Sequence, residues 1–108
     1  MSWLQRLFGI QKPAQAQTAP SPQSAEIPPE RMGLTGEYDE SGLAKRVALA
    51  FDEAGQLGDI ETLYVAQTGS TVVLKGAVPS QDHLNQAVSI ASRVRGASSV
   101  VASQVTVR

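Results

Sequence analysis

The sequence predicts a small α+β domain of order α-β-β-α-β, in which two helices cover one face of a three-stranded sheet. Three observations indicate this fold. Two stretches carry apolar residues at helical spacing, three short stretches are rich in β-branched residues, and turn residues separate these stretches. With 108 residues, the chain has room for one domain and one core.

The first predicted helix begins near Asp39 or Ser41, either of which can cap it, and ends at Gly55. Lys45 and Arg46 lie on this helix and are interpreted as solvated side chains that serve solubility. The apolar face of the helix consists of Leu43, Val47, Ala50, Phe51 and Ala54.

Two strands are predicted next, over residues 60–67 and 71–78. Thr68-Gly69-Ser70 joins them, which is a hairpin signal. Pro79 ends the second strand, because proline has no N–H to donate to a neighbouring strand.

The second predicted helix is capped by Ser80 and ends at Gly96. Arg93 and Arg95 fall in its last turn, where cations complement the exposed carbonyl groups. A final strand over residues 100–107 completes the sheet. The apolar face of the helix consists of Leu84, Ala87, Val88, Ala91 and Val94.

The chain before this domain divides into two parts. Residues 1–12, MSWLQRLFGIQK, form an amphipathic segment, and residues 13–38 form a Pro/Ala/Gln-rich linker that we expect to be disordered. The domain itself is predicted over residues 39–108. The segment is too short to hold a helix alone and needs a surface to fold against. Its predicted membrane- or partner-binding residues are Trp3, Leu4, Arg6, Leu7, Phe8, Ile10 and Lys12.

Three alternatives remain for this segment. On a membrane, its aromatic residues would enter the interface while Arg6 and Lys12 face anionic headgroups. It could instead occupy a protein groove, either on its own domain or on a partner. The third interpretation is a frayed terminus without a function.

Composition excludes several classes of function. The chain has no cysteine and one histidine, His83, which leaves no disulfide or thiolate site and almost nothing for metal binding or nucleophilic catalysis. We therefore predict no enzyme and no cofactor, and interpret His83 as neither pH sensor nor ligand. Residues 26–62 hold nine acidic side chains against three basic ones, so a nucleic-acid partner is disfavoured.

Two further expectations concern membranes. Lys75, Arg93 and Arg95 are a candidate patch for lipid headgroups, although a charge cluster at a helix C-terminus is more often a solvated end whose cations match the helix dipole. The start of the chain has neither a signal peptide nor a myristoylation pattern, and no stretch is long enough to span a bilayer. We expect a cytoplasmic protein, with peripheral attachment to a membrane as an option.

The stretch from about Glu40 to Val107 resembles the BON domain, a small module named after bacterial osmotic-stress and nodulation proteins. The family pattern Val-x-Leu-x-Gly-x-Val is similar to VVLKGAV, which begins at Val72, with Gly76 expected to permit the close approach of a helix backbone or a bulge. The pattern Val-x-Asn-x-Leu-x-Val is similar to VASQVTV, which ends at Val107. Here Ser103 replaces the Asn, and the preceding loop is one residue longer than usual.

The resemblance implies a noncatalytic module that binds phospholipid surfaces or envelope components, as in stress-response proteins, secretins and mechanosensitive channels. We therefore expect an adaptor that engages a phospholipid membrane surface or an envelope-associated protein, in a stress response. Some short cytoplasmic relatives bind potassium and join a BON domain to a LysM domain behind a brief apolar segment. The alternative is thus a cytoplasmic potassium sensor whose N-terminal segment packs on the BON domain; a cation held by backbone carbonyls leaves no side-chain signature.

Overall fold

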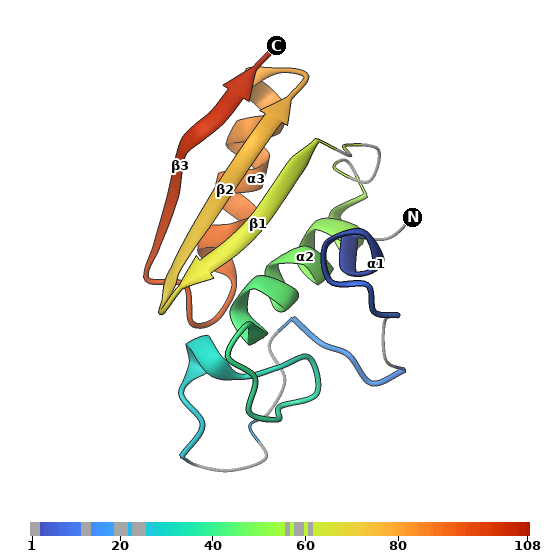
Figure 1. Ribbon diagram of the computed structural model, residues 1–108, viewed down its shortest axis with the longest axis vertical. Helices are drawn as coiled ribbons and strands as arrows, with labels where there is room; N and C mark the ends of the chain where they lie inside the picture. The colour runs from blue at the N-terminus through green and yellow to red at the C-terminus, as the bar shows by residue number, and fades with distance from the viewer. Residues whose placement is uncertain are drawn as a thin grey trace.

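The computed structural model describes residues 3–11, 14–18, 22, 26–55, 57, 60 and 62–108. Figure 1 shows α3 behind the sheet and α1 beside α2, on the side away from β3. The predicted α+β fold is confirmed, with α1 and η1 preceding it. The elements are α1 (Trp3–Phe8), the 3₁₀ helix η1 (Pro29–Arg31), α2 (Gly42–Ala54), β1 (Leu63–Thr68), β2 (Thr71–Val78), α3 (Gln81–Arg93) and β3 (Ser99–Val107).

The sheet has the strand order β1-β2-β3, so β2 is its central strand. β2 pairs antiparallel with β1 and parallel with β3. The turn between β1 and β2 places Gly69 at a φ of 59°, in the left-handed region that glycine adopts readily. The predicted hairpin is therefore confirmed, although β1 begins at Leu63 rather than at residue 60.

Gly76 allows a close approach between backbones within the sheet layer. Its φ is 112°, and a Cβ atom at this position would lie 2.0 Å from the carbonyl oxygen of Thr62. That same carbonyl accepts a hydrogen bond from the N–H of Ala77 at 3.0 Å. The neighbour is thus the chain entering β1, and not the helix backbone that the sequence suggested as one alternative.

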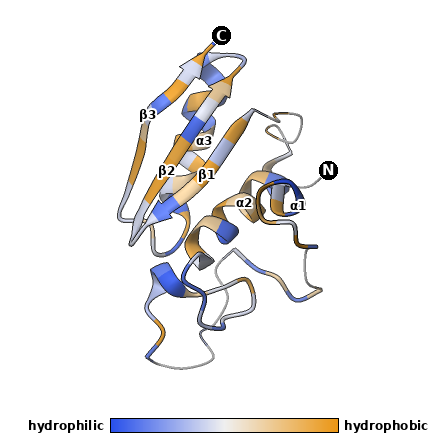
Figure 2. Ribbon diagram, viewed as in Figure 1, coloured by the Kyte–Doolittle hydropathy of each residue, from blue (hydrophilic) through white to orange (hydrophobic). Residues whose placement is uncertain are grey.

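The core lies between the helices and one face of the sheet. Figure 2 shows hydrophobic and hydrophilic residues alternating along the strands, as a sheet covered on one face requires. Ala54 departs from the prediction: it is exposed because it is the last residue of α2, beyond the packed turns. The fully buried side chains of the predicted elements include Leu43, Val47, Phe51, Leu63, Val72, Leu74, Ala87 and Ala91.

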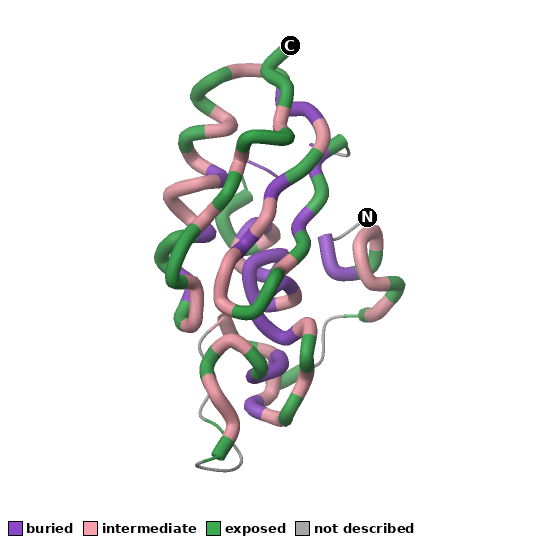
Figure 3. The backbone as a smooth tube through the Cα atoms, turned by 60° about the vertical axis from the view of Figure 1, so that its left-hand side comes forward, coloured by how far each residue is buried: buried purple, intermediate pink, exposed green. Residues whose placement is uncertain are grey.

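The residues before Asp39 also contribute to the core, whereas the sequence predicted a disordered linker over residues 13–38. Trp3 and Leu4 are buried at the start of α1, and Met32 and Leu34 are buried after η1 (Figure 3). We call this part of the chain, residues 3–38, the N-terminal extension. Its residues 12, 13, 19–21 and 23–25 lie outside the described residues.

Candidate functional site

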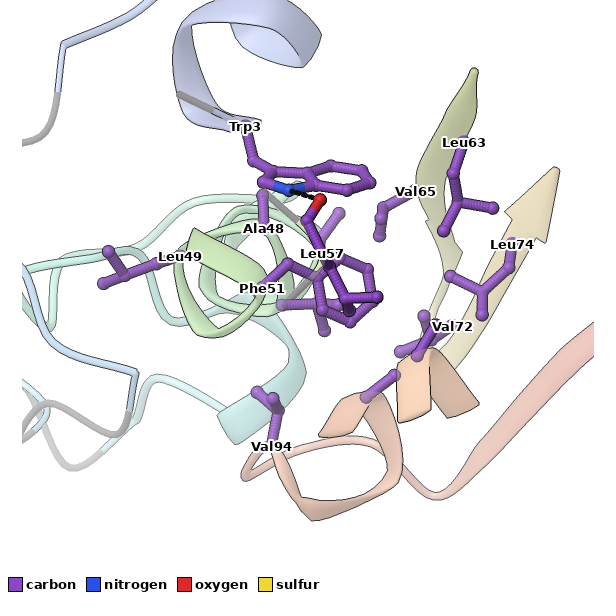
Figure 4. Packing of buried hydrophobic residues seen from close by; sticks show 14 of the residues in the cluster. Trp3, Ala48, Leu49, Phe51, Leu57, Leu63, Val65, Val72, Leu74 and Val94 are labelled. Atoms are coloured by element: carbon purple, nitrogen blue, oxygen red, sulfur yellow. Dashed lines mark hydrogen bonds between the residues drawn. The ribbon is translucent and has the colours of Figure 1, made fainter. Parts of the chain in front are cut away.

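Trp3 is the centre of the contact between α1 and the rest of the molecule. Its indole Nε1–H donates a hydrogen bond to the carbonyl oxygen of Leu57 at 3.1 Å. Its ring packs edge-on against Phe51, with the centroids 5.0 Å apart and the planes at 68° (Figure 4). Because its apolar body is buried and its polar N–H is satisfied, Trp3 is bound to its own domain as a core residue.

The first turn of α1 is fixed to α2 by a carboxylate. The backbone N–H of Trp3 donates to both carboxylate oxygens of Asp52, at 2.9 and 3.1 Å. The first N–H groups of a helix have no partner within the helix, and a negative charge is favourable there. Asp52 therefore stabilises a helix of six residues that would not persist alone.

Arg6 faces the domain. Its Nη2 donates to the carbonyl oxygens of Leu63 at 2.7 Å and of Ile60 at 3.3 Å. Its guanidinium also lies 4.4 Å from the Trp3 ring centroid and 5.4 Å from that of Tyr64. Arg6 thus joins α1 to the start of β1 through hydrogen bonds and cation–π contacts.

The remaining apolar residues of the segment pack on the domain as well. Leu7, Phe8 and Ile10 are partly buried against the core, and the Lys45 ammonium lies 5.9 Å from the Phe8 ring centroid. Lys12 lies outside the described residues. Of the alternatives for this segment, the structure therefore shows the groove on its own domain.

Arg46 holds the N-terminal extension on the opposite end of α2. Its side chain is fully buried and donates only to backbone carbonyls: those of Met32 at 2.7 Å, Thr18 at 3.4 Å, Pro29 and Arg95. The interpretation of Arg46 as a solvated side chain is wrong. Its partners come from the extension and from the loop after α3, and so could not be recognised from the spacing of residues along α2.

The charge of Arg46 is not balanced by a carboxylate within hydrogen-bonding distance among the described residues. Burial, and secondly the neighbouring Arg95 guanidinium, lowers the pKa of Arg46 to about 10. It therefore remains protonated at neutral pH, and this end of the molecule carries a buried positive charge.

A pocket lies at the same end, where α3 meets the loop leading to β3. It has a volume of about 210 Å³. Arg93 and Arg95 line it together, and neither forms an ion pair with an acidic side chain in the part of the chain that the structure describes. The other lining residues are Thr18, Ala50, Ile90 and Val94. We call this the arginine pocket.

Lys75 lies apart from the arginine pocket, so the three cations suggested as one headgroup patch are not together. It is exposed next to buried Leu74, which places it on the sheet face that the helices leave open, opposite Tyr64 on β1 and Gln104 on β3. Arg93 and Arg95 lie together because they are two positions apart in the sequence. Side chains alternate between the two faces of the sheet along β2, and this places Lys75 on the face away from them.

His83 has a structural partner. Its Nδ1 lies 2.6 Å from the hydroxyl of Ser80, and its backbone N–H donates to the same hydroxyl at 3.2 Å. The predicted capping of α3 by Ser80 is confirmed. Within the described residues, no group of three or more histidine or acidic side chains is placed to hold a metal ion.

Comparison with known proteins decides the family. A model of the BON domain matches residues 39–108. The chain belongs to the BON family. No curated protein and no solved structure matches it significantly. The whole N-terminal extension therefore lies outside the part of the chain that the BON model matches, although it is packed into the same core.

The BON motif residues have structural positions in the fold. Val72 and Leu74 are buried beneath the helices, and Gly76 admits the carbonyl of Thr62. Ser103, where the family pattern has Asn, lies where β3 has an extra residue: the register passes from Val73 opposite Val101 to Lys75 opposite Gln104. The departure thus coincides with a β-bulge, and the rest of the sheet is unaffected.

Membership of the BON family indicates a class of function but not a specific ligand or partner. BON domains are generally noncatalytic modules associated with membranes and phospholipids. None of the described helices has the length and apolar character needed to cross a bilayer. Two features of this chain bear on a more specific function: the N-terminal extension, which lies outside the BON match, and the arginine pocket.

Proposed function

We propose that this BON protein is a noncatalytic adaptor that binds an anionic phospholipid surface through the arginine pocket. The observation that carries the proposal is the pairing of Arg93 and Arg95 in one pocket of about 210 Å³, without an acidic partner among the described residues. Guanidinium groups match phosphate oxygens in a bidentate manner, which supports recognition of a phosphodiester headgroup.

The composition of the pocket supports a lipid over a free inorganic anion. Ala50, Ile90 and Val94 add an apolar wall beside the two guanidinium groups. A phospholipid presents phosphate and hydrocarbon next to each other at the membrane interface. The guanidinium groups would bind the phosphate, and the apolar wall would contact the hydrocarbon.

The local electric field also favours an anion. The end of α3 carries the equivalent of roughly half a negative charge. Arg93 and Arg95 oppose it with two full positive charges, and the buried Arg46 adds a third next to Arg95. The balance at the pocket is therefore positive.

In this proposal, the N-terminal segment has a structural role and does not anchor the protein in the membrane. Trp3 and Leu4 would each have to leave the core before entering a bilayer, and Arg6 would lose its bonds to two carbonyl groups. Membrane contact through the arginine pocket requires no such opening.

Co-sedimentation with vesicles tests this proposal. The full chain should pellet with vesicles of phosphatidylglycerol and phosphatidylcholine at low salt, and not with phosphatidylcholine alone. Each cation near an anionic surface contributes about 1 kcal/mol, so Arg93→Gln with Arg95→Gln should weaken binding about 30-fold. The matched control, Lys75→Gln with Arg108→Gln, removes the same charge from positions that do not line the arginine pocket.

Two results would overturn the proposal. One is the absence of pelleting by the full chain at low salt. The other is an equal loss of binding in the control pair, which would show that net charge, and not the arginine pocket, attracts the protein.

A second candidate is a potassium sensor, because it requires the N-terminal segment to pack on the BON domain, as α1 does. The carbonyls around Arg46 are already occupied by its guanidinium, so an ion would use other carbonyls. Thermal melts in KCl and NaCl at equal ionic strength test this candidate. At 100 times its dissociation constant the ion would add about 2.7 kcal/mol of stability, and identical melts would exclude it.

A further inference from the structure

The two edge strands of the sheet, β1 and β3, differ in what contacts their outer sides. At the β1 edge, Arg6 donates a hydrogen bond to the carbonyl oxygen of Leu63, the first residue of β1. β3 pairs with β2 on its inner side, and Figure 1 shows no described segment along its outer side. Peptide groups that point away from β2 are therefore open to pairing along β3.

The sequence of β3 lacks the usual protection of an open edge. Natural edge strands carry charged side chains or proline, or are kept very short. β3 has nine residues, from Ser99 to Val107, and none of them is charged or a proline. Its one protective device is the bulge before Gln104. After the bulge, Gln104–Val107 runs in unbroken register with β2.

We propose that Gln104–Thr106 pairs with the same segment of a second copy of this chain. The two strands would run antiparallel about a two-fold axis at Val105, which places Gln104 opposite Thr106 of the other copy. Both residues are exposed. The two sheets would then form one sheet of six strands, with the helices of both copies on the same face.

Physical chemistry favours a second copy over other occupants of this edge. Lipid cannot satisfy the open N–H and C=O groups of a strand, so the edge does not enter the bilayer. An uncharged strand can oppose its own copy without like-charge repulsion, and the amide of Gln104 can hydrogen-bond to the hydroxyl of Thr106 across the axis. Both the backbone and the side chains of β3 are therefore compatible with pairing to the same strand of a second copy.

Sedimentation velocity over a range of concentrations tests the pairing. The full chain should show a reversible monomer–dimer equilibrium. Gln104→Glu with Thr106→Glu places like charges opposite each other at two symmetric sites, and should raise the dimer dissociation constant about tenfold. The first of these carboxylates would lie beside Lys75 on β2, so the fold should be retained. The matched control, Ala66→Glu with Thr68→Glu, adds the same charge to exposed positions of β1.

A charge exchange separates lost pairing from lost folding. Gln104→Lys with Thr106→Lys should also weaken the dimer, and mixing this variant with the glutamate variant should restore association as a heterodimer. A full chain that stays monomeric over its soluble range overturns the proposal. So does a glutamate variant that dimerises like the control, or a mixture that remains monomeric. Neither variant changes the arginine pocket, so lipid binding is tested independently.

Discussion

The N-terminal extension and the BON domain supply one core by different means. In the domain, buried side chains recur at the periods of helices and strands, as Val72 and Leu74 do on β2. In the extension, the buried apolar side chains among the described residues are Trp3 and Leu4 on α1, and Met32 and Leu34 after η1. The comparison teaches that the stretch matched by a family model need not be the whole folding unit. Residues outside the match, here those of the N-terminal extension, can cover apolar surface of the matched domain.

The largest effect should come from the ring contact between the two regions. Trp3→Ala and Phe51→Ala should each lower the free energy of unfolding by about 3–5 kcal/mol, because each deletes a fully packed ring. The double variant should lose about 0.5–1.5 kcal/mol less than the sum of the single losses. Urea unfolding measures these free energies. Circular dichroism is the suitable signal, because Trp3 is the only tryptophan and its replacement removes tryptophan fluorescence.

The control for that experiment is Gln11→Ala, an exposed change within the extension. It should alter stability by less than about 0.5 kcal/mol. A Trp3→Ala variant as stable as this control would show that the extension is dispensable to the core.

The next largest effect should come from the link that Arg46 makes. Arg46→Met keeps an apolar stem but leaves four carbonyl groups without their donor, and should cost about 2–3 kcal/mol. Hydrogen exchange should show amide N–H groups near Met32 losing protection before those of β2. Glu53→Met, at an exposed position of α2, should leave their protection unchanged.

A smaller effect is expected within the BON domain alone. Ser80→Ala removes the hydroxyl that accepts the His83 N–H at the start of α3, and should cost about 1 kcal/mol. Ser41 precedes α2 but makes no such capping bond, so Ser41→Ala should cost less. Thermal unfolding of the two variants compares the caps directly, and equal losses would contradict the assignment.

The smallest effect should appear where the two regions join, at Asp39. Partial burial acts to raise the pKa of this carboxyl, but hydrogen bonds from Lys45 and Ser41 outweigh it and hold the pKa below its ordinary value. The stabilisation is therefore complete above about pH 4 and is lost as pH falls through the lowered pKa.

Asp39→Asn should remove this contribution, which is about 0.5 kcal/mol for a largely solvated pair. Urea unfolding at pH 7 and at pH 3 should show a larger loss of stability in the variant, relative to the natural chain, at pH 7 than at pH 3. A difference of equal size at both pH values would show that the carboxylate charge is not responsible.

Local signals in the sequence are sufficient for the elements of the domain. The pattern predicts β2 with its observed bounds, and Ser80 marks the start of α3. The predicted end at Gly96 is too late, because Val94 is already extended and α3 ends at Arg93. β-branched runs, caps and turns act over a few residues, so they can be recognised without the tertiary structure. The predicted start of β1 is three residues early because Ile60 is buried outside the strand.

The contacts of the extension could not be predicted in the same way. The amphipathic pattern of α1 indicated that its apolar face is covered, but the groove that covers it is formed by Phe51, Leu57 and the carbonyls of Ile60 and Leu63. Arg46 is a similar case, because its partners are backbone oxygens that carry no sequence signal. Only the arginine pocket was partly indicated, because Arg93 and Arg95 are close in the sequence, at the end of α3 and just after it.

The bond from the Trp3 indole to Leu57 also constrains the order in which the chain can fold. The two residues are 54 positions apart. At 5–20 residues per second, Leu57 is synthesised on the order of 3 to 10 s after Trp3, and the apolar face of α1 lacks its groove during that time. Closing so long a loop carries an entropic cost that favours the shorter contacts of the hairpin and α3 first. The part of the core that is made earliest would therefore be completed last.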